Sequence, residues 1–332
     1  MRTHLSTIAA AVLLAISAAS CSPSSSVDEF RALEYEGQQM LTDGMWSEAE
    51  EIFTTLIDSY SPDDHDALAT AYFNRSITHF QRGHIDDALA DETAAIELNP
   101  SDVNLLATLH LNRSREYAYL DETEDAIAAA TAAIDLDPDD TKTLTRAYIN
   151  RASQRSNLGR FDEALADFDA AIAASAIDSD RTHARVSRAE LLVHLERFDE
   201  AIVDATTAID ALNTEESEQR DGVATTTSEL LGRAYLARAS ATFVLATDLN
   251  EPLNDVPEKA QRIKADLTHA IDLMSDDDPW VLGRAYLLRG TAHYFTLDDV
   301  AARSDLERAR ELIPSDDPAY QSATEMLDEI IA

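Results

Sequence analysis

The polar residues that stand out in this chain are pairs of asparagine and arginine that recur at a fixed interval. The pair occurs three times, 38 residues apart, as Asn74–Arg75, Asn112–Arg113 and Asn150–Arg151. A guanidinium group can hold a carboxylate through two parallel hydrogen bonds. A side-chain amide can donate to the carbonyl and accept from the N–H of another backbone. The pattern therefore predicts a structural role for the arginine, and it leaves open whether the asparagine binds a partner.

An aspartate follows the arginine at a regular distance, which supports the structural role. The predicted pairs are Arg75–Asp91, Arg151–Asp167, Arg188–Asp204, Arg238–Asp266 and Arg289–Asp305. Because a buried arginine needs a charged partner, we expect these pairs to form a ladder within or between neighbouring repeats. The third repeat has Ala129 at the aspartate position, and Asp125 could serve Arg113 there instead.

The sixth repeat is longer than the others. Its aspartate, Asp266, comes 28 residues after Arg238, whereas the other pairs are separated by 16 residues. The extra residues must lie in segment 247–262, whose two prolines and two asparagines predict a loop between lengthened helices. Insertions of this kind often serve binding in repeat proteins, but a tolerated surface insertion explains the segment equally well.

Between these polar positions, apolar residues recur at intervals of three and four, which is the period of a helix. The phrases DDALAD, DEALAD and DEAIVD return in the second half of successive units. Gly83 and Gly159 stand between the two halves of their units, as helix stops do, and Pro100, Pro138 and Pro314 end units. Each unit is therefore predicted to be a helix, a turn and a second helix.

Two segments carry a recognisable family pattern. Residues 72–100, YFNRSITHFQRGHIDDALADETAAIELNP, and residues 148–172, YINRASQRSNLGRFDEALADFDAAI, resemble the tetratricopeptide repeat in their aromatic, small and proline positions. Seven such units span residues 28–314, and residues 315–332 are predicted to form a capping helix. The resemblance implies an all-α, right-handed superhelical solenoid of helix-turn-helix units.

The resemblance also implies a binding site. In tetratricopeptide repeats the first helices line a concave groove, and asparagines at this place contact the backbone of an extended bound peptide. A second polar position lies one turn earlier on the same helix face. The predicted groove residues are Asn74, Asn112, Asn150, Thr70, Thr108, Arg146, Arg233 and Arg284. The arginines among them favour a carboxylate on the partner. The alternative is that the asparagines only hydrate the groove.

The N-terminus is predicted to be a signal peptide over residues 1–20. A basic start is followed by 15 mainly apolar residues at 5–19, which are too few to span a membrane. The small residues before Cys21 resemble a bacterial lipobox, which implies lipidation of Cys21; ordinary secretion is the alternative. Residues 21–27 would then form the lipid anchor and a flexible tether. Since Ser22 and not aspartate follows the cysteine, we expect the outer membrane if the host has two membranes.

Composition and motifs argue against several functions. The chain has 63 acidic and 26 basic residues, a net charge of −37, so its surface should repel nucleic acid and anionic lipid. We therefore expect no nucleic-acid partner, and membrane contact only through a lipidated N-terminus. The sequence has no H-E-x-x-H spacing, Gly-rich phosphate loop or nucleophile elbow. It predicts no enzyme, no cofactor and no metal site.

These observations lead us to expect a non-catalytic scaffold or adaptor of the bacterial cell envelope that binds extended protein or peptide segments. One alternative is an assembly or biogenesis factor for outer-membrane or cell-wall machinery. Another is an accessory subunit that modulates an envelope enzyme. All three bind a protein partner, and the repeats do not distinguish them.

Overall fold

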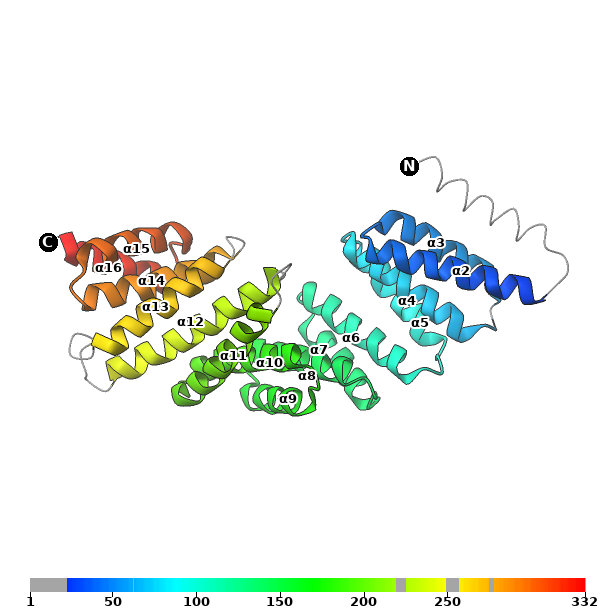
Figure 1. The fold of residues 1–332 in the computed structure, drawn as a ribbon, viewed down its shortest axis with the longest axis horizontal. Coiled ribbons are helices and arrows are strands. Elements are labelled where there is room, and N and C mark those ends of the chain that lie inside the picture. Colours follow the sequence, from blue (N-terminus) through cyan, green and yellow to red (C-terminus); the bar gives the residue numbers. More distant parts are fainter. Residues whose placement is uncertain (1–22, 62, 219–224, 249–256, 275–277, 332) are drawn as a thin grey trace. The chain divides into compact units, whose positions relative to one another are not determined.

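The chain is all α-helical over the residues that the computed structural model describes, which are 23–61, 63–218, 225–248, 257–274 and 278–331 (Figure 1). The first helices are α2 (Pro23–Thr42) with α3 (Trp46–Ser59), α4 (His65–Gln81) with α5 (Ile85–Glu97), and α6 (Val103–Tyr119) with α7 (Thr123–Asp135). Next come α8 (Thr141–Asn157) and α9 (Phe161–Ala174). The last are α10 (Asp178–His194) with α11 (Phe198–Glu218), α12 (Thr225–Asp248) with α13 (Pro257–Leu273), α14 (Pro279–Phe295) with α15 (Asp299–Leu312), and α16 (Pro318–Ile331). This order of helix pairs confirms the predicted all-α solenoid.

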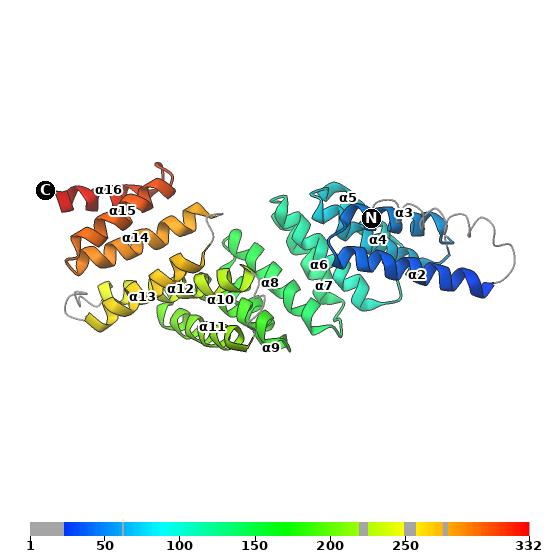
Figure 2. The same cartoon turned by 45° about the horizontal axis from the view of Figure 1, so that its top comes forward.

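The helices form two compact units, Met1–Leu158 and Gly159–Ala332. Within each unit, the first helix of a pair packs on its own second helix and on the second helix of the preceding pair. Helix α4 lies against α3 and α5 in the first unit, and α14 lies against α13 and α15 in the second. The successive helices of each unit can be followed in Figure 2. Residues on a first helix can therefore contact two second helices.

Small side chains allow this close packing. The alanines of the repeated phrase, Ala88, Ala126, Ala164 and Ala201, are fully buried. An alanine side chain ends at its Cβ, so a neighbouring helix can approach closely and still leave no void. Larger residues such as Phe53 fill the spaces between the helix pairs. The repeated alanines are core positions, as the helical period predicts.

The start of the first described helix differs from the prediction. The sequence predicts a flexible tether up to residue 27, but α2 begins at Pro23. Proline is well tolerated in the first turn of a helix, because its missing N–H would have no partner there. The predicted signal peptide and Cys21 lie outside the described residues. Among the described helices, none has the length and apolar character that a membrane span requires.

The two irregular parts of the repeat array are the sixth pair and the C-terminal helix. Helices α12 and α13 have 24 and 17 residues, against 17 and 13 in α4 and α5. The insertion therefore lengthens both helices, and its remaining residues, 249–256, lie outside the described residues. Helix α16 packs Ala323 and Leu327 onto Leu306 of α15, so it covers the last pair as a cap.

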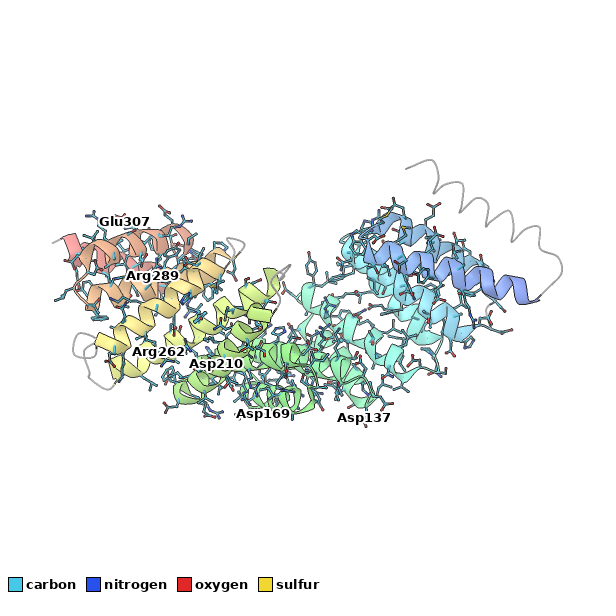
Figure 3. The ribbon with its side chains drawn as sticks, viewed as in Figure 1. Asp137, Asp169, Asp210, Arg262, Arg289 and Glu307 are labelled. Carbon is cyan, nitrogen blue, oxygen red and sulfur yellow. The ribbon has the colours of Figure 1, made fainter. Side chains whose placement is uncertain are left out.

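Acidic side chains lie on the solvent-exposed surface of both units. The four labelled acids in Figure 3, Asp137, Asp169, Asp210 and Glu307, are all exposed. Exposed carboxylates keep their hydration, so they carry the negative charge without a burial cost.

Candidate functional site

The arginine–aspartate pairs are the most regular polar feature of the helix array. Nε and Nη2 of Arg75 donate to the two carboxylate oxygens of Asp91 at 2.8 and 2.7 Å. The same two bonds join Arg188 to Asp204, Arg238 to Asp266 and Arg289 to Asp305. The aspartate side chains are at most 9% exposed. We call these four pairs the ladder. The Arg238–Asp266 pair forms despite the insertion, so the helix packing and not the loop length determines its geometry.

The ladder also joins neighbouring helix pairs. In three of its members, the remaining guanidinium nitrogen, Nη1, donates to the second helix of the preceding pair. These bonds join Arg75 to Thr54, Arg188 to Asp169 and Arg289 to Thr268. The guanidinium of Arg75 also lies 5.5 Å from the ring centroid of Tyr72, one turn earlier on α4. Each such arginine is held by its own pair and by the preceding one.

Two arginines of the series differ from the ladder. Arg151 belongs to the first unit and Asp167 to the second, so their pairing stays a prediction. Arg113 belongs to the repeat without the aspartate, and it donates to the hydroxyl of Tyr117 at 3.0 Å. The described residues show no contact between Arg113 and Asp125, so that predicted substitute partner is wrong. Tyr117 lies one turn further along the same helix and is therefore within easy reach of Arg113.

The first unit has a groove between α4 and α6, which we call the N-terminal groove. It has a volume of about 210 Å³ and is lined by Phe73, Ile77, Phe80, Gln81, Thr108, Asn112, Arg115 and Glu116. The guanidinium of Arg115 lies 5.6 Å from the ring centroid of Phe80. Two predicted groove residues, Thr108 and Asn112, line this space. It combines aromatic surface with an amide that can bind a main chain.

Two buried carboxyl groups adjoin the N-terminal groove. Glu92 on α5 is fully buried and Glu116 on α6 is 3% exposed. One carboxylate oxygen of Glu92 accepts a hydrogen bond from the hydroxyl of Ser76 at 3.4 Å. Burial raises the pKa of both groups, and the charge of Glu116 raises the pKa of Glu92 further. The surroundings therefore favour the neutral form of both carboxyl groups.

The second unit has a larger groove, which we call the C-terminal groove. It has a volume of about 480 Å³ and is lined by residues of α10, α12 and α14, together with Met274 and Asp278. Val193, Leu236 and Leu288 provide apolar surface. Trp280 is 41% exposed, and its indole N–H donates to Asp317 at 2.8 Å. The C-terminal groove therefore presents an exposed aromatic ring whose orientation is set by a hydrogen bond.

The two predicted arginines of the C-terminal groove have different surroundings. Arg284 is exposed and its guanidinium lies 4.8 Å from the ring centroid of Trp280. A partner carboxylate that formed an ion pair with Arg284 would therefore lie beside the ring of Trp280. Arg233 instead donates to both carboxylate oxygens of Glu190 on α10. Glu190 therefore neutralises the charge of Arg233 in the free protein, and the binding of Arg233 to a partner stays a prediction.

The other predicted groove residues lie outside both grooves. Asn74 is only 6% exposed, and its amide nitrogen is buried. Thr70 is half-buried and donates to the backbone carbonyl of Asp66 at 2.9 Å. Asn150 and Arg146 lie on α8, the last helix of the first unit, and Arg146 is exposed. Within the first unit, Thr108 and Asn112 thus line one groove, and within the second unit Arg233 and Arg284 line another.

The sequence interpretation missed several groove residues. Phe73 and Phe80 line the N-terminal groove, and Trp280 and Glu190 line the C-terminal groove. Trp280 carried a signal, because it lies four residues before Arg284, on the same helix face as a predicted groove residue. Glu190 carried none, since the residue two places after the repeated arginine differs from one repeat to the next.

Comparisons with known proteins identify the repeat. The family profile described as Tetratricopeptide repeat matches residues 149–215, and a second profile with the same description matches residues 107–140. Among curated protein sequences, none matches this chain.

Several solved structures share the fold. A tetratricopeptide repeat protein from Parabacteroides merdae is 18% identical with a TM-score of 0.54, over 91% of this chain and 99% of that one. The structure of pilF from Pseudomonas aeruginosa is 14% identical with a TM-score of 0.54, over 79% of this chain and 98% of that one. The C-terminal part of a TPR repeat-containing protein from Cytophaga hutchinsonii is 14% identical with a TM-score of 0.51, over 88% and 98%. At these identities the likeness extends to the fold alone. The matched profiles identify tetratricopeptide repeats at residues 107–140 and 149–215, and the solved structures show that the helix pairs share the fold of tetratricopeptide-repeat proteins.

Proposed function

We propose that this chain is a non-catalytic scaffold or adaptor that binds an extended protein segment along the first helices of its repeats. Tetratricopeptide repeats generally bind protein or peptide partners, and such solenoids offer long binding surfaces. The observation that supports the proposal most is the C-terminal groove. It combines apolar side chains from α10, α12 and α14 with the exposed ring of Trp280 and the charge of Arg284.

The groove favours a particular chemistry in its partner. Val193, Leu236 and Leu288 suit aliphatic or aromatic side chains, because burying them there removes apolar surface from water. Arg284 suits a carboxylate on the partner, either a side chain or a chain end. Glu229 and Asp278 also line the groove, so a run of acidic residues would be repelled. The proposed partner is therefore an apolar segment with a single acidic group.

The proposal includes export and a lipid anchor at Cys21. The basic start, the apolar segment and the small residues before this lone cysteine support it. Metabolic labelling with a palmitate analogue would label the wild-type protein, and a Cys21→Ser protein would lose the label. Retention of the label on the Cys21→Ser protein would contradict lipidation. If the host has two membranes, fractionation should place the protein in the outer one.

Site-specific crosslinking tests the binding proposal in the native host. A photoreactive amino acid at Ser240, which lines the C-terminal groove, should give a discrete crosslinked product with the partner. The same group at Arg303, an exposed residue on α15, is the matched control and should give none. Equal crosslinking from both positions would place the partner elsewhere. The partner's identity then separates a scaffold from an assembly factor or from an enzyme's accessory subunit.

A further inference from the structure

The turn between α4 and α5 brings three side chains of metal-binding type together. One nitrogen of His79, one nitrogen of His84 and one carboxylate oxygen of Asp87 lie within 4.8 Å of one another. Gly83 has a φ of +78°, and the N–H of His84 donates to the carbonyl of His79 at 2.9 Å. This bond closes a Schellman turn and brings the two histidines close together. Asp87 lies in the first turn of α5, beside them.

The remaining bonds of the histidines leave ring nitrogens available. Nε2 of His79 lies 3.5 Å from the ladder residue Asp91, whereas Nδ1 has no hydrogen-bond partner in the described part of the chain. His84 occupies the N-cap position of α5, but its side chain makes no capping hydrogen bond. Metal-binding histidines commonly place one ring nitrogen on the ion and the other on a carboxylate that fixes the ring. His79 and Asp91 have this arrangement, and Arg75 holds Asp91 in place.

We propose that His79, His84 and Asp87 bind a divalent transition-metal ion, with Zn²⁺ as the best match, and that water completes its coordination. Two imidazoles and one carboxylate are ligands that Zn²⁺ accepts, and catalytic-type zinc sites use three protein ligands. Zn–N bonds of about 2.0–2.1 Å place the ligand atoms of a tetrahedral site about 3.3 Å apart. His84 and Asp87 are exposed, so their side chains can rotate to bring the ligand atoms from within 4.8 Å to this shorter separation. The bound ion would join the end of α4 to the start of α5.

The sequence predicts no metal site, because the spacing H-x4-H-x2-D is not one of the familiar zinc motifs. The turn geometry brings these residues together. The turn between α14 and α15 provides an internal comparison. There the N–H of Asp298 donates to the carbonyl of His293 at 3.0 Å, and His293 Nδ1 lies 3.3 Å from the Asp298 carboxylate. Ala301 stands where the first turn of α5 has Asp87, so this second turn has only two of the three donors.

Titration with Zn²⁺ and with Co²⁺ tests the proposal. The full chain would be used without a histidine tag and with Cys21→Ser, so that no thiol competes for the ion. Isothermal titration should show one tight equivalent of Zn²⁺, and bound Co²⁺ should give the visible absorption of a low-coordinate site. His84→Ala and Asp87→Ala should each weaken that equivalent by at least about 100-fold, since even outer-shell changes cost 10–100-fold. His293→Ala is the matched control and should bind like the parent.

Thermal unfolding provides a second readout. Zn²⁺ should raise the unfolding temperature of the parent and of His293→Ala but not that of His84→Ala. Circular dichroism should show that all variants are folded, which is expected because His84 is exposed. If the His84→Ala and Asp87→Ala proteins bind Zn²⁺ as tightly as the parent, the ion binds only adventitiously to the acidic surface. That result, or the absence of a tight equivalent in the parent, would overturn the proposal.

Discussion

The ladder and the grooves both use the first helices, but the ladder keeps the same residues in each of its repeats, whereas one groove position changes from repeat to repeat. Arginine returns at one position in every ladder repeat, and its aspartate returns on the second helix. Two residues further along the first helix, the groove-lining residue changes each time. That position holds Ile77, Arg115, Glu190 and Ser240 in different repeats.

The difference separates what the fold requires from what a partner requires. Each helix pair packs on the next in the same geometry, so the same guanidinium–carboxylate pair stabilises each of these contacts. An extended partner presents a different side chain to each repeat, so the groove positions vary. Changes in the ladder should therefore lower stability, and changes in the grooves should lower affinity and leave stability nearly unchanged.

The largest expected loss of stability comes from changes in the Arg238–Asp266 pair, which is the most buried pair of the ladder. Asp266→Ala leaves a buried guanidinium without its carboxylate, and we expect a loss of about 3–5 kcal/mol in the free energy of unfolding. Arg238→Met should cost less, because a stranded carboxylate can take up a proton and a guanidinium cannot release one. Urea unfolding measures both variants.

The exposed Arg303–Glu307 pair provides the control for this measurement. Arg303→Met should change the free energy of unfolding by less than about 1 kcal/mol. Equal and small losses from Asp266→Ala and Arg303→Met would mean that the ladder does not stabilise the fold, and the contrast with the grooves would fail.

The second effect concerns the buried carboxyl pair beside the N-terminal groove. The pKa is raised from 4.5 to about 10 in Glu92 and to about 7 in Glu116. The folded state therefore holds protons that the unfolded state releases above pH 4.5. Stability should be full below that pH and should fall as the pH rises toward these raised values, by at most about 1.4 kcal/mol per pH unit for each proton.

Glu92→Gln removes one of these protons from the equilibrium. We expect it to raise the free energy of unfolding at pH 8 by about 1–3 kcal/mol and to flatten its pH dependence. Urea unfolding from pH 4 to pH 9 measures this, and Glu307→Gln at an exposed position serves as the control. An unchanged pH profile in Glu92→Gln would show that the pair is ionised and solvated.

A third prediction concerns the groove amide. Asn112→Ala should weaken binding of a partner that occupies the N-terminal groove by about 0.5–1.5 kcal/mol, or up to about tenfold, through one lost hydrogen bond. Stability should stay nearly the same, because alanine favours a helix. Asn74→Ala is the matched comparison, since Asn74 is buried outside the groove. Asn74→Ala should change stability without a specific loss of affinity. If Asn74→Ala weakens binding and Asn112→Ala changes only stability, then Asn74 and not Asn112 contacts the partner.

The smallest expected change in stability concerns turn residues that belong to neither the ladder nor the grooves. Leu297 has a φ of +58° and is 80% exposed in the turn after α14. Leu297→Gly should stabilise the fold by up to about 1 kcal/mol, because glycine adopts this backbone conformation without strain. Gly159→Ala makes the opposite change at a φ of +72° and should destabilise it. Both should leave partner affinity unchanged, and they set the baseline against which ladder and groove variants are compared.

The sequence predicted most of the fold because helix period, turn residues and repeat spacing are local signals. It placed Asp266 opposite Arg238 across an insertion, and these side chains form two hydrogen bonds. It failed at Pro23, where a helix continues into the segment predicted as a tether. The helical period locates a residue within a helix, but it does not locate the start of the helix here, because a flexible tether and a helical extension have similar composition.

The candidate site was predicted less well than the fold. Arg233 meets Glu190 and Asn74 is buried, and both outcomes depend on side chains of neighbouring helices at no fixed sequence distance. Arg113 donates to the hydroxyl of Tyr117 on its own helix and not to Asp125 on the next helix. Repeat alignment cannot foresee such contacts, because they arise from residues that the repeats do not share.

The central claim is that the C-terminal groove binds a protein partner. Its most direct test is the affinity of a partner segment, recovered by crosslinking at Ser240, for Trp280→Ala/Arg284→Ala compared with wild type. Isothermal titration should show binding weakened by about 100-fold, as expected for the loss of an aromatic and arginine hot spot, while urea unfolding shows a folded protein. Arg303→Ala should bind like wild type. If the folded double variant binds its partner as tightly as wild type, the groove is not the binding site and the account is contradicted.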